Sequence, residues 1–342
     1  MILIFALSAS TASAVPPPLH PGAIGEPLKP APYVLRAPVQ RLPPAAIQIR
    51  GATINVTFAG GKLALPPARV MLWITTAVRA VTDYYGRFPV NHANIRIIPV
   101  SGRKGVLYGH TWADHDVFTD VYVGQYTQPS DLDNDWVMTH EMVHYAFPSL
   151  EHDHHWLEEG LATYVEPIAR LEAGDLNAAT VWSELVEGLP RGLPRHGDRG
   201  LDHTHTWGRT YWGGAMFCLL ADIHIHQQTH NRRGLRDALR AIVAHGGNIE
   251  AQWSIERALN TGDRAVGVPV LARLYDEMKS KPVAPDFAHL WRQLGVQPEG
   301  DMVAFSDNAP MARIRRAIAF NPRPKNVART GSPVPRDMSL LP

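Results

Sequence analysis

Residues 140–144 read His-Glu-Met-Val-His, and residues 156–162 read Trp-Leu-Glu-Glu-Gly-Leu-Ala. Side chains four residues apart lie on the same face of an α-helix, one turn apart. The imidazoles of His140 and His144 can therefore bind a single metal ion, while the carboxylate of Glu141 faces the same space. This stretch predicts a helix that carries a metal, and we expect the rest of the chain to fold around it.

A catalytic zinc site needs a third protein ligand, because two imidazoles supply only half of a tetrahedral set and the fourth position is kept for water. One known arrangement places a third histidine six residues after the second, but that position is Leu150 here. The remaining candidates follow within one short segment: Glu158, Glu159, His152, His154 and His155. The motif alone leaves the choice among them open.

The segments around the motif show strand-like and helix-like patterns. Apolar and polar residues alternate over 54–58, which predicts a half-buried strand followed by a hairpin turn at Gly60-Gly61. Apolar residues at helical spacing predict a helix over 67–86, closed by Gly86. The other elements predicted up to residue 175 are strands at 95–100, 105–111 and 117–123 and helices at 134–147 and 155–173, the last with Pro167 as a kink or early stop.

The pattern changes after Gly174 and becomes helical almost throughout. Helices are predicted at 177–187, 208–228, 233–244, 249–259, 267–280 and 285–293. The long irregular segment 188–202 is expected to border a cleft, because long internal loops are often functional. We therefore predict an α+β fold, with a mixed-sheet catalytic domain over residues 45–175 and an all-helical region over residues 176–320 that completes the cleft.

The two ends of the chain differ from the rest in composition. Residues 1–14 combine an apolar run with small residues ending at Ala14, which predicts an export signal cleaved after Ala14 and hence a periplasmic or secreted protein. Residues 15–44 contain ten prolines and predict an extended linker. Residues 321–342 predict a disordered basic, proline-containing tail.

Overall composition limits the classes of partner. The chain has 33 basic and 32 acidic residues, so it has no strong net field to attract nucleic acid or an anionic membrane surface. The apolar run at the N-terminus is too short to predict a transmembrane segment. The single cysteine, Cys218, lies in an apolar run and is expected to be buried and unreactive. Nucleic acid is therefore not an expected partner.

The motif and the residues that follow it resemble the gluzincin zinc metallopeptidases of the peptidase MA-like group, especially the membrane-alanyl-aminopeptidase and glycyl-aminopeptidase branches. The resemblance implies a thermolysin-like catalytic domain and one zinc ion held by His140, His144 and Glu159. It implies that Glu141 is the general base that activates a zinc-bound water. In the stretch Tyr-Trp-Gly-Gly-Ala over 211–215, it implies that Tyr211 stabilises the oxyanion.

This sequence departs from that pattern at two places. Fourteen residues separate His144 from Glu159, about one helical turn fewer than those families use, so Glu158 stays an alternative ligand. The segment 105–111 has no glutamate where the aminopeptidases bind the substrate amine. We predict a zinc metallopeptidase without assigning exo- or endopeptidase activity; the alternative is a zinc-bound, non-catalytic module that binds a peptide or protein.

Overall fold

The computed structural model describes residues 45–320. The predicted export signal at 1–14, the linker at 15–44 and the tail at 321–342 lie outside the described residues and stay predictions. Among the helices of residues 45–320, none is both long enough and apolar enough to cross a membrane.

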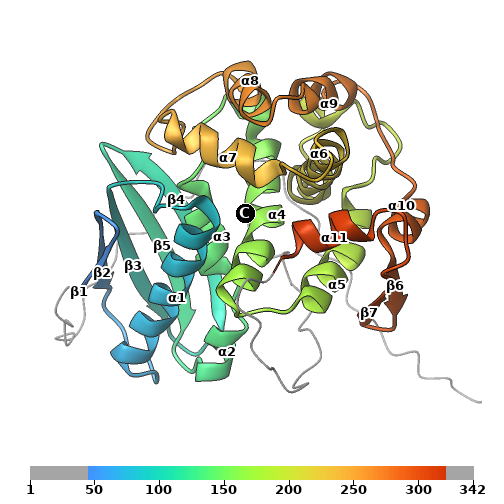
Figure 1. Cartoon of the computed structure of the whole chain (residues 1–342). Helices are drawn as coiled ribbons and strands as arrows, with labels where there is room; N and C mark the ends of the chain where they lie inside the picture. The colour runs from blue at the N-terminus through green and yellow to red at the C-terminus, as the bar shows by residue number, and fades with distance from the viewer. Residues whose placement is uncertain (1–44, 321–342) are drawn as a thin grey trace, which may run out of the picture. The chain divides into compact units, whose positions relative to one another are not determined.

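A five-stranded sheet forms one layer of the fold (Figure 1). Its strands are β1 (Ala45–Ile49), β2 (Ala52–Phe58), β3 (His92–Val100), β4 (Val106–Asp114) and β5 (Asp116–Gly124), in the spatial order β1-β2-β3-β5-β4. The β2–β3 and β3–β5 pairs are parallel, while β1–β2 and β4–β5 are antiparallel, so the sheet is mixed as predicted. Strand β4 is therefore at one edge of the sheet.

The predicted hairpin at Gly60-Gly61 is wrong. The antiparallel partner of β2 is β1, which precedes it through a turn at Arg50 and Gly51, where both residues have positive φ. After Gly60-Gly61 the chain instead leads into helix α1 (Pro67–Tyr85), and the next strand, β3, pairs with β2 in parallel. A parallel pair needs such a crossover, which a two-glycine turn does not supply.

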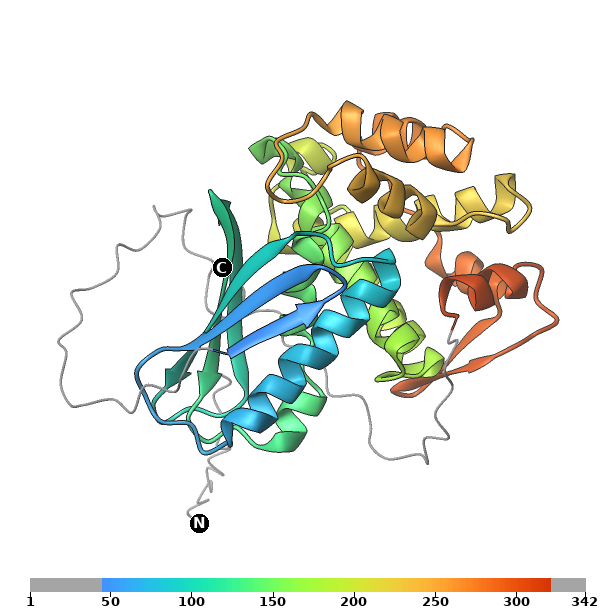
Figure 2. The same ribbon diagram turned by 60° about the vertical axis from the view of Figure 1, so that its left-hand side comes forward.

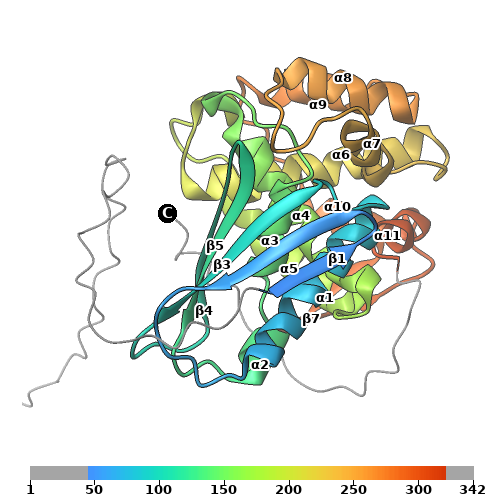
Figure 3. The same ribbon diagram turned by 90° about the vertical axis from the view of Figure 1, so that its left-hand side faces the viewer.

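Helices lie on one face of the sheet, as Figures 2 and 3 show for α1. The predicted helix over 134–147 is shorter in the structure, α3 (Val137–His144), and it begins where Asp135 accepts the first backbone N–H groups. A short helix that was not predicted, α2 (Pro129–Asp133), precedes it. Helix α4 (His155–Ala173) does not stop early at Pro167 but continues to its cap at Gly174. Almost every residue of α4 is buried, so its packing outweighs the local cost of the proline.

The region after α4 contains most of the remaining helices. They are α5 (Ala178–Gly188), α6 (Gly214–Gln228), α7 (Leu235–Ala244), α8 (Ile255–Val266), α9 (Val270–Met278), α10 (Phe287–Leu294) and α11 (Ala312–Ile318). The helix predicted at 249–259 begins later, at Ile255, because the side chain of Ser254 caps the N–H of Arg257. The region is not all-helical, since β6 (Val296–Glu299) and β7 (Met302–Phe305) form an antiparallel hairpin.

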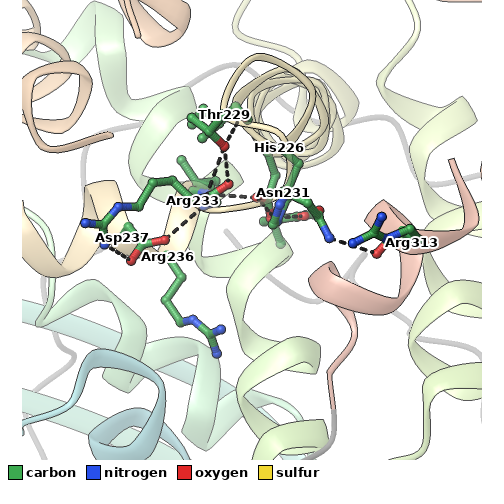
Figure 4. Close-up of polar contacts among 12 residues, drawn as sticks. His226, Thr229, Asn231, Arg233, Arg236, Asp237 and Arg313 are labelled. Carbon is green, nitrogen blue, oxygen red and sulfur yellow. Dashed lines mark hydrogen bonds and ion pairs between the residues drawn. The ribbon is translucent and has the colours of Figure 1, made fainter. Parts of the chain in front are cut away.

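Polar contacts join α11 to the turn between α6 and α7 (Figure 4). The hydroxyl of Thr229 accepts the N–H of Arg233 at 3.1 Å, and the carboxylate of Asp237 accepts the N–H at the start of α7 at 2.9 Å. The side chain of Asn231, which has a positive φ of 64°, donates to the carbonyl of Arg313 at 3.4 Å. The chain beyond residue 308 thus adds a packed helix to the fold.

Candidate metal centre and cleft

The start of helix α3 is fixed by Asp135. Its carboxylate accepts the backbone N–H groups of Val137 at 3.1 Å and Met138 at 3.0 Å, which a helix start leaves without partners. It also accepts the indole N–H of Trp73 on α1 at 3.1 Å. Burial raises the pKa of Asp135 to about 6. The direction in which α3 presents its histidines is therefore tied to helix α1.

Three donor atoms from α3 and α4 converge. The Nε2 atom of His140 lies 3.2 Å from Oε2 of Glu159, and Nε2 of His144 lies 3.6 Å from the same oxygen. All three donor atoms lie within 4.8 Å of one another. A tetrahedral zinc ion with bonds of about 2.0–2.2 Å separates its ligand atoms by roughly 3.3–3.6 Å. The two measured nitrogen–oxygen separations and the donor types therefore fit a zinc ion.

The charge states of these groups also suit a metal, which binds neutral imidazole and ionised carboxylate. Burial lowers the pKa of His144 to about 4, so this imidazole is neutral near pH 7. Burial by itself would raise the pKa of Glu159, but the neighbouring histidines hold it well below its ordinary value. Residues His140 and Glu159 are 1% and 8% exposed, so the site has little access to bulk water.

Glu141 lies next to this cluster and packs against the edge strand. A Cβ atom at Gly109 on β4 would lie 2.5 Å from Cγ of Glu141 and 2.8 Å from Cγ1 of Val137, so only glycine allows this approach. Burial, opposed by His140, raises the pKa of Glu141 to about 7. A carboxylate with such a pKa is suited to accept and release a proton near neutrality.

The other candidate ligands point elsewhere. One oxygen of Glu158 accepts the N–H of Leu150 at 2.7 Å, and the other faces Nδ1 of His155 at 2.9 Å. The ring of His152 stacks on that of His205, and His154 lies 3.0 Å from the hydroxyl of Tyr275. The candidate ligands Glu158, His152 and His154 thus lie outside the converging group. The geometry favours Glu159 over Glu158 as the third ligand.

Tyr211 lies on a π-helical turn, Arg209–Gly213, that precedes α6. Its ring stacks on His140 with the ring centres 6.3 Å apart and the planes 24° apart. Burial raises the pKa of its hydroxyl above the ordinary value, and the charges of Glu159 and Glu141 raise it further. The structure therefore brings Tyr211 to the same site as the four motif residues, and its hydroxyl stays protonated.

A backbone contact between two helices places Tyr211 beside Glu159. A Cβ atom at Gly160 on α4 would lie 2.3 Å from Cα and the carbonyl carbon of Gly214, the first residue of α6. A Cβ atom at Gly214 would lie 2.1 Å from the carbonyl oxygen of Trp156. The two helices thus cross with no side chain between them. Glu159 comes one residue before Gly160 and Tyr211 three residues before Gly214, so this close contact brings both to the same site.

The segment 188–202 supports the Tyr211 turn. A Cβ atom at Gly192 would lie 2.3 Å from the carbonyl carbon of Trp212, so the segment packs against the backbone of the turn. Arg209 forms a buried ion pair with Asp198 at 2.8 Å. Among residues 45–320, the cavity lining includes none from this segment, so the prediction that it borders the cleft is wrong. Gly188 and Gly192 of this segment instead pack closely against Trp212.

The converging group opens into a cavity of about 410 Å³. One wall is the edge strand, residues 108–113, and the opposite wall comes from α3, α4 and Tyr211. Sequence reasoning missed the contact of Gly109 with Glu141. It considered His155 only as a possible ligand. For the contact with Glu141, the available signal was the position of Gly109 between two aromatic residues of a predicted strand.

No protein-family model matches the sequence, and no curated protein matches it either. Among solved structures, the chain is similar to an aminopeptidase N family protein from Idiomarina loihiensis, with a TM-score of 0.57 and 13% identity over 74% of this chain and 49% of that one. It is also similar to an M1 zinc metallopeptidase from Deinococcus radiodurans bound to a Tyr-Ser-Ala substrate, with a TM-score of 0.47 and 17% identity over 72% of this chain and 53% of that one.

The comparison with the Idiomarina loihiensis protein establishes the class of fold. The chain has the fold of this aminopeptidase N family protein, so the resemblance to the gluzincins drawn from the sequence is confirmed at the level of fold. The chain spans about half the length of either structure.

Proposed function

We propose that this protein is a zinc metallopeptidase of the gluzincin type, with a thermolysin-like arrangement of sheet and motif helix and one zinc ion held by His140, His144 and Glu159. The observation that carries the proposal is the convergence of their three donor atoms within 4.8 Å, with Glu141 buried beside them. The substrate is a peptide or protein. We also propose that the protein is exported, from the sequence of residues 1–14.

A zinc ion held by His140, His144 and Glu159 would supply Lewis-acid chemistry, which makes water more acidic and polarises a carbonyl group. Glu141 accepts the proton of the attacking water and delivers it to the leaving amine. The hydroxyl of Tyr211 donates a hydrogen bond to the carbonyl oxygen as negative charge develops on it. The low exposure of the cluster strengthens each of these electrostatic contacts.

The edge strand β4 offers a place for the substrate backbone. Its only strand partner among the described residues is β5, and residues 108–113 line the cavity on the other side. An extended peptide can add to such an edge by main-chain hydrogen bonds, which do not depend on the peptide sequence. This mode is compatible with cleavage at the end of a peptide or within it.

The first test measures zinc binding and hydrolysis together. We expect the purified protein with one equivalent of zinc to cleave a library of quenched fluorescent peptides. Cleavage should stop on addition of a chelator and return when zinc is restored. Zinc binding without cleavage would favour the non-catalytic binding module, and a protein that binds no zinc would contradict the proposal. Comparing free with N-acetylated peptides, and mapping the products by mass spectrometry, would separate terminal from internal cleavage.

Tyr211→Phe is expected to lower kcat by roughly 10²- to 10³-fold, as the loss of one oxyanion donor does in other hydrolases. The substitution keeps the ring that stacks on His140, so zinc affinity and KM should change little. Steady-state kinetics and zinc titration check this result. Tyr126→Phe, at a tyrosine that is 56% exposed, is the matched control. An unchanged kcat in Tyr211→Phe would remove the hydroxyl from the mechanism.

A further inference from the structure

His155 is the first residue of α4 and lies between two carboxylates. Its Nδ1 atom is 2.9 Å from Oε2 of Glu158, and its Nε2 atom is 3.3 Å from Oε1 of Glu159. Ionised carboxylate oxygens only accept hydrogen bonds, so the ring faces an acceptor at each nitrogen. Each ring nitrogen of His155 therefore lies beside the carboxylate oxygen of a different glutamate.

The two oxygens of Glu159 therefore have different partners. Oε2 faces the Nε2 atoms of His140 and His144, at 3.2 and 3.6 Å, while Oε1 faces His155. A carboxylate held at one oxygen cannot rotate freely about its terminal torsion. The contact with His155 thus selects which oxygen of Glu159 is presented to the two imidazoles.

Glu158, which holds His155, is itself attached to a backbone segment that is held in place. Oε1 of Glu158 accepts the N–H of Leu150 at 2.7 Å. The preceding residue, Ser149, is held by two backbone hydrogen bonds, from its N–H to the carbonyl of Ala251 at 2.9 Å and to its carbonyl from the N–H of Trp253 at 3.1 Å. The contacts run from this anchored loop through Glu158 and His155 to Glu159.

We propose that His155, held by Glu158, is a positioning residue that fixes the Glu159 carboxylate for the metal without binding the metal itself. This inference rests on the proposed function, because it assumes that zinc binds at His140, His144 and Glu159. Groups that orient a metal ligand in this way usually contribute about 10- to 100-fold to metal affinity.

The test compares zinc affinity in the apoprotein of the full chain, measured by competition with a chromophoric chelator. We expect His155→Leu to weaken zinc binding by about 10- to 100-fold. His155→Gln keeps an N–H donor and should recover part of the affinity. His152→Leu, the same substitution three residues earlier at a histidine outside the cavity lining, is the control and should bind zinc like the wild type. Thermal unfolding of the apoproteins shows whether each variant is folded.

A double-mutant cycle tests the role of Glu158. Glu158→Gln should weaken zinc binding in the wild-type background and change it little in the His155→Leu background, because the two residues act in series. Wild-type affinity in both His155 variants would overturn the inference. Loss of zinc in His155→Leu as complete as in His144→Leu would also overturn it, since His155 would then be a ligand. A wild-type protein that binds no zinc would contradict the proposed function instead.

Discussion

Glu141→Gln is expected to lower kcat by about 10²- to 10⁴-fold while leaving zinc binding intact. The carboxamide has nearly the volume of the carboxylate, so it fits the space against Gly109, where a Cβ atom would already lie 2.5 Å from Cγ of Glu141. It cannot accept the proton of the attacking water. Peptide hydrolysis under saturating substrate and zinc titration of the same sample measure the two effects separately.

The control for this variant is Glu187→Gln, at a glutamate on α5 whose side chain is 57% exposed and pairs with Arg191. It should keep wild-type kcat. Hydrolysis that persists in Glu141→Gln would show that another group takes the proton. Loss of zinc together with activity would mean that Glu141 supports the metal site rather than the proton transfer.

Gly160→Ala is expected to damage both stability and turnover. The new methyl group would lie 2.3 Å from backbone atoms of Gly214, and backbone cannot move aside as the end of a side chain can. Helices α4 and α6 must separate, which costs about 1–3 kcal/mol of unfolding free energy, the usual range for overpacking. The same separation moves the Tyr211 turn away from Glu159, so kcat should fall further than the loss of stability explains. Chemical denaturation and kinetics below the unfolding transition test both effects.

Gly262→Ala in helix α8 is the matched control. Its methyl group would first meet Cδ1 of Leu271 at 2.6 Å, the end of a flexible side chain, and alanine favours a helix interior over glycine. Stability should stay close to that of the wild type or increase, with kcat unchanged. Equal behaviour of the two variants would show that the crossing of α4 and α6 is less tight than the geometry indicates.

The parts of the fold that could be predicted from the sequence are those that depend on the residue pattern within a single helix or strand. The apolar spacing of α1 and the β-branched runs of β3 and β5 indicate elements that the structure contains near the expected bounds. The spacing of one helix turn between His140 and His144 indicates two metal ligands, and the short segment that follows them restricts the third ligand to a few residues. Spacing in the sequence could not decide between Glu158 and Glu159, since that depends on which side chain the loop at Leu150 captures.

The remaining parts depend on contacts between distant residues. The predicted hairpin placed the antiparallel partner of β2 after it in the sequence, whereas the partner, β1, precedes it. The prediction failed because adjacent glycines such as Gly60-Gly61 are typical of tight turns but do not require one. The need for glycine at 109, 160 and 192 follows from neighbours far along the chain, which no local pattern contains. The β6–β7 hairpin was missed because each strand has only four residues, too few for a clear alternation.

The short bridge between Ser149 and Gln252 has a consequence for where the functional unit of this protein ends. The three converging donors all come from residues before 175, so the first half of the folded chain looks sufficient by itself. Yet the loop between the two ligand-bearing helices is held by residues 251–253, and Tyr211 is supplied from beyond that boundary. The smallest part of the chain that can assemble the complete centre therefore extends past Trp253, and its two halves are not separable modules.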